Sequence, residues 1–363
     1  MPSIRGAWRD GLPVLLLLIC AVPTAAAGSP FARAPEIPQD VLAEVLKKQS
    51  EASFEGERVW TYYLTGREEH PTRRQRVTHR PPTDYRVDYL EQPAGEERHV
   101  ILSGDRLMEW DEDLKVRLRE READDTLGLL LTLDYLQRLE ENYEIRADRG
   151  PKVAGRATYA VRVVPRYKGR PAVQVWVDQQ WGVPLKMERY DYMGRLGIRM
   201  EYSRITFGGE FGDALFEAPP DAEIREGRSS PVYRSPEEFY AAEQQLVPVA
   251  TVLPKGFRFV EARPTRYNRK PAVQTFYTDG YADFSLFVID QPDPPAGADQ
   301  PGIRDLKSVR SGTNNWVMGW LGERRLAIVS YRLAEAELAR ILLSVQLDRT
   351  LPEVTYYEGL PPM

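Results

Sequence analysis

The residue types that most often carry enzymatic chemistry are sparse in this chain. Its 363 residues include one cysteine, Cys20, and three histidines, His70, His79 and His99. There is no G-x-S-x-G elbow to present an activated serine and no H-E-x-x-H pair to bind zinc. We expect His79 and His99, which fall in predicted strands, to be hydrogen-bonded or solvent-facing side chains. The sequence therefore predicts a protein that is not an enzyme and binds no metal or cofactor.

Carboxylates cluster around Trp110, in the run from Glu109 to Asp113. A calcium loop needs alternating oxygen ligands and a glycine, and this run has neither. We interpret the run as the solvated tip of a hairpin. Farther along the chain, Asp279-Gly280 is typical of a tight β-hairpin turn, where glycine tolerates a positive φ.

The composition is that of a globular protein, with 42% hydrophobic and 28% charged residues. The 54 acidic residues slightly outnumber the 49 basic ones, for a net charge of −5. A nucleic-acid-binding protein would show a concentrated basic excess, so nucleic acid is not an expected partner.

Residues 1–27 have the pattern of a secretory signal peptide. Arg5 and Arg9 precede an apolar run from Leu12 to Val22, and small residues follow up to Ala27. The run of about 11 residues is too short to span a bilayer. Cleavage after Ala27 would leave an exported, cysteine-free chain, peripheral to the membrane at most. A signal anchor is the alternative, whereas lipidation of Cys20 is disfavoured because Ile19 precedes it.

The element pattern predicts an α+β fold whose first domain covers residues 36–217. An amphipathic helix is expected at 37–48, and a leucine-rich helix at 127–139. Period-two alternation predicts an antiparallel meander between them and beyond. The expected strands cover 59–64, 75–79, 85–89, 99–102, 106–110, 143–146, 157–165, 173–177, 185–190 and 196–207.

A proline-rich stretch at 218–236 reads as a linker to a smaller mixed α/β domain at 237–345. Strands are expected there at 257–262, 273–278, 283–289, 317–321 and 326–331, with a long loop at 290–305 and a closing helix at 334–345. Residues 346–363 look like a loose tail.

Aromatic residues are frequent on the predicted strands of the first domain. Such residues suit pleated surfaces, so a packed core explains them. The alternative is a curved half-barrel sheet whose concave side, plugged by the helices, holds an apolar ligand. For that pocket we expect inward-facing side chains from the strands and from the leucine-rich helix: Trp60, Tyr62, Leu64, Tyr85, Tyr89, Leu130, Leu133 and Trp176.

Three stretches resemble the MucB/RseB family of periplasmic sigma-E regulatory proteins. The first is GRATYAVRVVPR at 155–166, and the second is VWVDQQWGVPLK at 175–186. The third opens with LPKGF at 253–257 and continues with FYTDGYADFSLFV at 276–288. The resemblance covers roughly residues 38–345.

The resemblance implies a first domain like the lipoprotein carrier LolA and a periplasmic location. It also implies binding to the periplasmic domain of a membrane anti-sigma factor, which the family shields from proteolysis. Lipopolysaccharide or mislocalised lipoprotein, held by its acyl chains in the pocket, would release that partner. The contact residues implied lie in the turn-bearing segment: Tyr277, Asp279, Tyr281, Phe284 and Phe287.

Two roles remain open at this stage. One is a regulator that binds an anti-sigma factor and senses lipid. The other is a lipid or lipoprotein carrier of LolA type without a regulatory partner. Both depend on an apolar pocket in the first domain.

Overall fold

Alternating apolar and polar residues from Phe54 onward form a run of antiparallel strands in the computed structural model. The structure describes residues 37–63, 68–90, 98–111, 115–120, 133–226, 230–267, 269–290, 302–311 and 314–359. These residues belong to one compact unit, Pro35–Met363. The predicted signal peptide lies outside the described residues.

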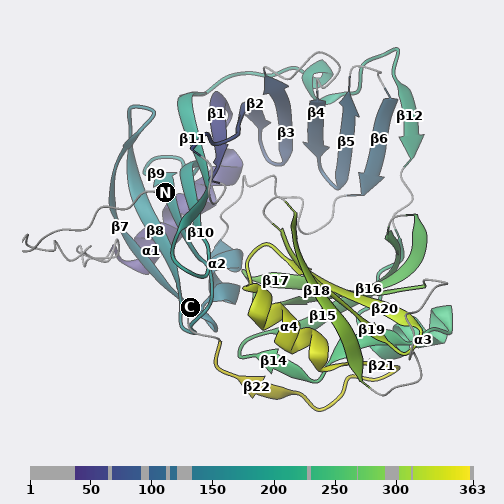
Figure 1. The fold of residues 1–363 in the computed structure, drawn as a ribbon. Helices are drawn as coiled ribbons and strands as arrows, with labels where there is room; N and C mark the ends of the chain where they lie inside the picture. Colours follow the sequence, from purple (N-terminus) through teal and green to yellow (C-terminus); the bar gives the residue numbers. More distant parts are fainter. Residues whose placement is uncertain are drawn as a thin grey trace, which may run out of the picture. The chain divides into compact units, whose positions relative to one another are not determined.

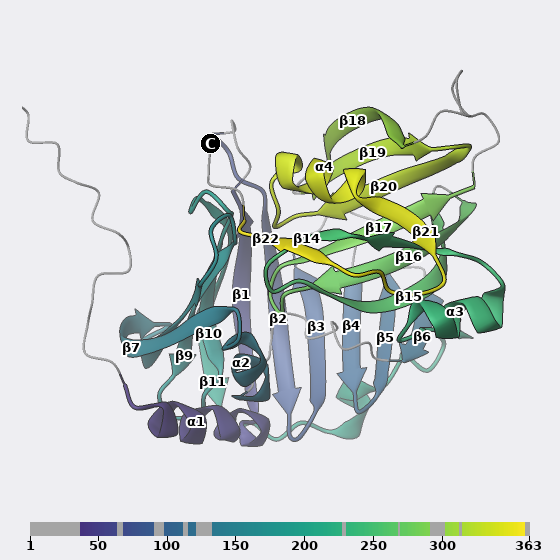
Figure 2. The same cartoon turned by 90° about the horizontal axis from the view of Figure 1, so that it is seen from below.

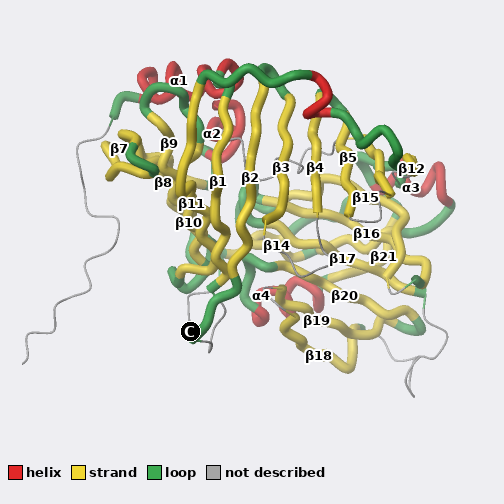
Figure 3. The backbone as a smooth tube through the Cα atoms, turned by 90° about the horizontal axis from the view of Figure 1, so that it is seen from above, coloured by secondary structure: helices red, strands yellow, loops and turns green. Residues whose placement is uncertain are grey.

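A twelve-stranded sheet forms the first lobe, and its strand order is β12-β6-β5-β4-β3-β2-β1-β11-β10-β9-β8-β7 (Figure 1). Every pairing is antiparallel except β12 with β6. The strands are β1 (Phe54–Tyr62), β2 (Thr72–Arg80), β3 (Asp84–Leu90), β4 (Arg98–Ser103), β5 (Arg106–Asp111), β6 (Lys115–Glu120), β7 (Tyr143–Val153), β8 (Arg156–Pro165), β9 (Ala172–Asp178), β10 (Pro184–Tyr190), β11 (Leu196–Phe207) and β12 (Glu223–Glu226). Figure 3 shows β1 to β5 side by side along this curved sheet.

Short helices accompany the first sheet. They are α1 (Gln39–Lys47), the 3-10 turn η1 (Lys48–Glu51), α2 (Leu133–Leu139) and the 3-10 turn η2 (Asp213–Phe216). Helix α1 buries Leu42, Val45 and Leu46, each contributing about 1.5–3 kcal/mol of transfer free energy. It lies beside the β9–β10 turn (Figure 2), where a Cβ on Gly182 would stand 2.2 Å from the Val45 carbonyl oxygen. Of the leucine-rich helix expected at 127–139, the structure describes 133–139.

The second lobe is built on a six-stranded antiparallel sheet with the order β15-β16-β17-β20-β19-β18. Its strands are β15 (Arg258–Tyr267), β16 (Lys270–Thr278), β17 (Asp283–Ile289), β18 (Ile303–Ser311), β19 (Asn314–Leu321) and β20 (Arg324–Ser330). Two helices belong to this lobe, α3 (Pro236–Glu243) and α4 (Glu335–Leu343). Helix α4 buries Leu338, Ile341 and Leu342 in the core of the lobe.

The described part of the predicted tail, residues 346–359, is not loose. β21 (Val345–Asp348) pairs antiparallel with β13 (Val247–Ala250), and β22 (Thr355–Tyr357) pairs parallel with β14 (Val252–Pro254). The segment is held in place because its backbone groups pair with those of β13 and β14, and because the Tyr357 side chain is buried.

The expected linker at 218–236 also carries structure. Strand β12 pairs with β6, and α3 begins inside the segment. The side chain of Ser235 caps α3 by accepting from the Glu238 amide, while the Glu238 carboxylate accepts from the Arg234 amide. This reciprocal cap explains a helix start beside a proline.

Candidate functional site

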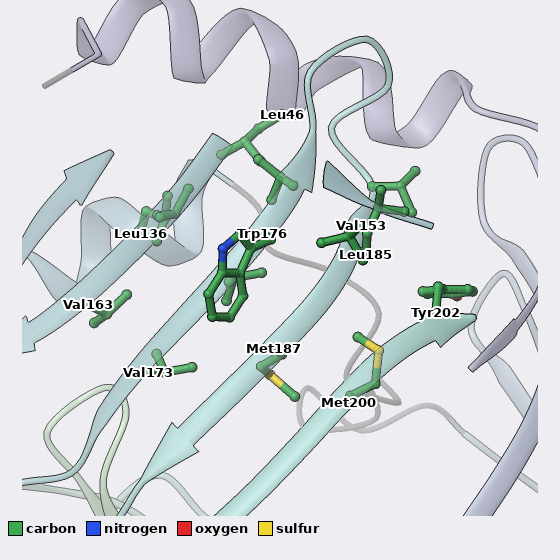
Figure 4. Packing of buried hydrophobic residues seen from close by; sticks show 14 of the residues in the cluster. Leu46, Leu136, Val153, Val163, Val173, Trp176, Leu185, Met187, Met200 and Tyr202 are labelled. Atoms are coloured by element: carbon green, nitrogen blue, oxygen red, sulfur yellow. The ribbon is translucent and has the colours of Figure 1, made fainter. Parts of the chain in front are cut away.

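The first sheet has a core-facing side on which apolar side chains line up across six strands. The strand register places these residues opposite one another, so that they form two rows running across the strands. One row is Ala147, Val161, Val175, Met187, Met200 and Trp60, and the other is Ile145, Val163, Val173, Arg189, Ile198 and Tyr62. Figure 4 shows Met187 and Met200 on neighbouring strands of this face. Arg189 is the one charged member of either row.

Four predicted pocket residues share this side of the sheet. Trp60 and Tyr62 are in phase with the buried Phe54 on β1, and Tyr85 and Tyr89 oppose His79 and Gln75 on β2. Tyr85 is buried, whereas Trp60 and Tyr89 are half-buried against the core. Leu64 and Leu130 lie outside the described residues, and Leu133 begins α2. The role of these residues in ligand binding stays a prediction.

Trp176 does not join them, because it lies on the opposite face of the sheet. Its cross-strand partner is Lys186, which in turn pairs with Glu201, whereas Trp60 aligns with Met187 and Met200. Side chains alternate between the two faces of a strand, so a shift of one residue changes the face. The Lys186 ammonium lies 4.7 Å from the Trp176 ring centre. Trp176 and Trp60 therefore cannot line the same pocket.

A buried polar pair stands among the aromatic residues of the core-facing side. Arg58 Nε and Trp60 Nε1 each donate to Gln75 Oε1 at 2.8 Å. Burial lowers the pKa of Arg58 from its ordinary value, and the neighbouring Tyr202 opposes that effect. The sequence prediction missed Arg58, although it repeats the inward phase of Phe54 and Trp60. The sequence does contain a signal for it, namely a charged residue at a strand position where the alternation predicts an apolar one.

The hairpin between β16 and β17 joins the two lobes at its Asp279-Gly280 tip. Tyr143 Oη donates to both carboxylate oxygens of Asp279, at 3.0 and 2.9 Å, and Asn142 Nδ2 donates to its carbonyl at 2.8 Å. Gly280 has φ +103° at the tip, and a Cβ there would lie 3.1 Å from Leu139 Cδ2. Tyr281 packs into the core of the first lobe. The hairpin is thus held between α2 and β7.

Arg170 supplies the charge that this contact needs. Its side chain lies 3.4 Å from the Asp279 carboxylate and donates from Nη1 to Glu337 Oε1 at 2.9 Å. All three side chains are buried, Glu337 completely. The guanidinium also lies 4.8 Å from the Phe257 ring centre. Because Glu337 belongs to α4, one arginine of the first lobe ties down two elements of the second.

Burial shifts the pKa of two carboxyls near this contact. It raises the pKa of Asp279 above its ordinary value, although Arg170 and several hydrogen bonds act in the opposite direction. It likewise raises the pKa of Asp283, which pairs with Arg332 at 3.2 Å. Tyr143 also has its pKa raised, first by burial and then by Asp279.

The five residues predicted to contact a partner fall in three different places. Asp279 and Tyr281 lie between the lobes, with 3% and 4% exposure. Tyr277 and Phe284 stack on each other in the core of the second lobe. Phe287 is half-buried in a separate cluster with Trp316. In this arrangement the five do not form one exposed surface, and their role in partner binding stays a prediction.

Two hollows in the described part of the molecule are lined by other residues than the predicted pocket residues. One, of about 80 Å³, lies between the β10–β11 hairpin and the second lobe, with Tyr281 in its wall. The other, of about 420 Å³, lies on the second lobe beside Leu306, Met318 and Trp320.

The histidines of the strands are held by hydrogen bonds. His79 is buried with Nδ1 2.5 Å from the Ala52 carbonyl, and His99 Nδ1 lies 2.6 Å from Asp88 Oδ1. Among the described residues, no three His, Cys, Asp or Glu side chains come close enough to hold a metal ion. None of the described helices has both the length and the apolar character of a membrane span.

The fold and these contacts describe a two-lobed protein whose lobes meet at the buried tip of the β16–β17 hairpin. The model of the MucB/RseB N-terminal domain matches residues 38–222, half of the chain, and the protein belongs to this family. The sigma factor AlgU regulatory protein MucB of Pseudomonas aeruginosa is 24% identical over 146 residues. That match covers 40% of this chain and 44% of the relative, less than half of its length.

Solved structures of the same kind of protein share the fold. The Pseudomonas aeruginosa MucA/MucB complex superposes with a TM-score of 0.61 at 20% identity, covering 85% of this chain and 98% of the other. MucB in complex with MucA(peri) gives 0.60 at 18% identity, with the same coverage. At these identities the similarity concerns the fold, and it extends over both lobes.

Proposed function

We propose that this protein is a periplasmic regulator that binds the periplasmic domain of a membrane anti-sigma factor and so controls release of an envelope-stress sigma factor. Membership of the MucB/RseB family carries the proposal. The two-lobed fold supports it, because the similar MucB chains were solved in complex with MucA. The pattern of residues 1–27 supports export.

The direct test uses residues 28–363 and the periplasmic segment of the single-span anti-sigma protein encoded beside its sigma factor in the same genome. We expect a stable 1:1 complex in calorimetric titration and slower cleavage of the segment by its site-1 protease. Absence of binding, together with lipid co-purifying with the chain, would instead favour a carrier of LolA type.

We further propose that the core-facing side of the first sheet senses an acyl chain of lipopolysaccharide or lipoprotein. Trp60, Tyr62 and Tyr89 are half-buried there, so they keep surface that a ligand can cover. Trp60→Glu should abolish binding of a fluorescent fatty acid while the circular dichroism stays native. Thr61→Glu, on the opposite face of the same strand, is the matched control and should bind normally. Equal binding by both variants would rule out this face.

A further inference from the structure

The hollow between the β10–β11 hairpin and the second lobe is rich in arginine. Arg189 and Arg195 come from the hairpin, and Arg310 and Arg332 come from the second lobe. Its volume of about 80 Å³ is room for roughly five to eight water molecules. A carboxylate-sized group fits this space.

The carboxylates near the hollow are already engaged. Asp191 pairs with Arg195 at 2.9 Å and accepts from two backbone amides of its own turn. Asp283 pairs with Arg332 at 3.2 Å. Within the described residues, the four arginines that line the hollow have two carboxylates as ion-pair partners, which leaves an excess of two positive charges.

Arg189 and Arg310 carry this excess. Neither makes an ion pair within the described part of the chain, and the Nε of Arg189 is buried without a hydrogen-bond partner. Arg189 also occupies a position in a cross-strand row that is otherwise uncharged, between Val173 and Ile198. Arg189 is half-buried, and the charge of Asp283 reaches it only from beyond ion-pair distance. An anionic group in the hollow would therefore offset the cost of burying this guanidinium.

The walls of the hollow hold another guanidinium in a fixed orientation. Arg332 lies 4.3 Å from the Tyr281 ring centre and 4.4 Å from that of Tyr331. A stacked guanidinium keeps its planar fork, which suits bidentate binding of a carboxylate.

The properties of β18, the strand that carries Arg310, indicate which kind of molecule would supply the carboxylate. β18 is the last strand of the second sheet and pairs with β19, and no other described strand pairs with its outer edge. Leu306 and Val309 on this strand are 40% and 48% exposed. The strand also carries three basic residues and one acidic residue. An extended chain of acidic character complements this edge in both hydrogen bonding and charge.

We propose that an acidic, extended peptide segment of the partner protein adds to the outer edge of β18 and places a carboxylate side chain in the hollow, between Arg189 and Arg310. This rests on the proposed function, in which the partner is the anti-sigma factor's periplasmic segment. A peptide carboxylate suits a hollow of this size, whereas a whole lipid needs a continuous apolar channel.

The test measures the affinity of that segment for residues 28–363 and for three variants. Arg310→Glu and Arg189→Gln should each weaken binding by roughly tenfold or more. Arg266→Glu, the same charge change on the opposite edge strand β15, should leave the affinity unchanged. Changing the acidic residues of the segment to amides should weaken its binding to the wild-type chain but not to Arg310→Glu. Circular dichroism checks that each variant is folded.

The outcomes separate this inference from the proposed function. If the wild-type chain does not bind the segment, the proposed function fails. If it binds and Arg310→Glu binds equally well, or if Arg266→Glu weakens binding as much, only the site in the hollow is refuted. Phosphatidylglycerol vesicles form a second arm: loss of vesicle binding in Arg310→Glu, with the segment still bound, would assign the hollow to an anionic lipid headgroup and overturn the proposal.

Discussion

At the scale of single residues, the contact between the lobes depends on one buried arginine. Arg170 faces Asp279 and Glu337, and all three are shielded from water. A buried pair of unlike charges contributes little compared with an apolar substitute, but removing one member leaves an unpaired buried charge. Replacing Arg170 should therefore lower the free energy of unfolding by far more than its ion pairs contribute to it.

Arg170→Met should lower the free energy of unfolding by about 3–5 kcal/mol, because two carboxylates lose their cation. Urea unfolding followed by tryptophan fluorescence measures the change. The control is Arg225→Gln, which removes an exposed ion pair with Glu223 and should leave the midpoint unchanged. A midpoint unaffected by Arg170→Met would mean that water reaches these carboxylates.

Asp279 gives the contact a defined pH dependence. Burial raises its pKa in the folded state above the ordinary value of 3.8, so the folded protein binds this proton more tightly than the unfolded chain does. The stability that the protonated Asp279 carboxyl contributes is fully present below its pKa in the unfolded chain. It is lost as the pH rises through its pKa in the folded protein.

Asp279→Asn removes this titration, and the measurement is unfolding free energy from pH 3.5 to 7. The free energy of the wild type minus that of the variant should fall as the pH rises. Asp283, whose pKa is also raised, titrates in both proteins and cancels. A difference that grows with pH would show that Arg170, rather than burial, dominates the carboxyl.

At the scale of elements, hairpin turns were predictable because their chemistry is local. Asp279-Gly280 indicates a tight turn in any context, and the structure has one there. Which hairpin tip enters the other lobe was not predictable, since that depends on α2 and β7, more than 130 residues earlier in the chain.

Two glycine substitutions distinguish the local need for a turn from the contact that a hairpin tip makes with the other lobe. Gly104 and Gly280 both have positive φ, but a Cβ at Gly104 meets nothing within 4 Å, whereas one at Gly280 lies 3.1 Å from Leu139 Cδ2. Gly104→Ala should cost about 1 kcal/mol for backbone strain alone. Gly280→Ala should cost roughly 2–3 kcal/mol, because strain adds to displacement of the tip. Thermal unfolding of both variants measures this, and equal losses would contradict close packing of the tip.

Most strands of the first sheet were predictable from the sequence. The strands β18, β21 and β22 of the second lobe were not. Period-two alternation placed β2 to β5 and β8 to β11 within a few residues, whereas β1 begins earlier than predicted, at Phe54, and β7 continues to Val153. β18 lies partly in the stretch expected to be a loop, because its exposed edge position removes the apolar alternation on which the prediction relied. β21 and β22 are too short to show a pattern, and only their partners β13 and β14 define them.

The face of each candidate residue was predictable only within one strand. Trp60 and Tyr62 share the inward phase that the alternation of β1 indicates. Trp176 lies on another strand, and its face depends on the register through β10 and β11, which no local pattern contains. Arg189 is the opposite case. Its phase matches Leu185 and Met187, so a charged residue at an apolar phase could have marked it.

At the scale of the whole molecule, each lobe has its own core, and the side chain of Tyr281 joins the two at the hairpin tip. Tyr281 of the second lobe lies in the cluster that contains Tyr143 and Leu139, and Gly256 approaches Asn142 so closely that a Cβ would stand 2.4 Å from Oδ1. Partner binding through Asp279 or Tyr281 would therefore require this buried contact to open, whereas binding at β18 would not.

The buried contact between the lobes predicts that they unfold together. Calorimetry of residues 28–363 should show a single transition whose van't Hoff and calorimetric enthalpies agree. Combining Asn142→Ala with Arg170→Met removes the amide and guanidinium contacts of the hairpin tip, leaving those of Tyr143. The double variant should divide the heat into two transitions, one for each sheet, while Arg225→Gln keeps one. The reason is that each sheet retains its own apolar cluster once the tip is released. Two resolved transitions in the wild-type chain would mean that the tip contributes too little to couple the lobes, and opening them for a partner would then cost almost nothing.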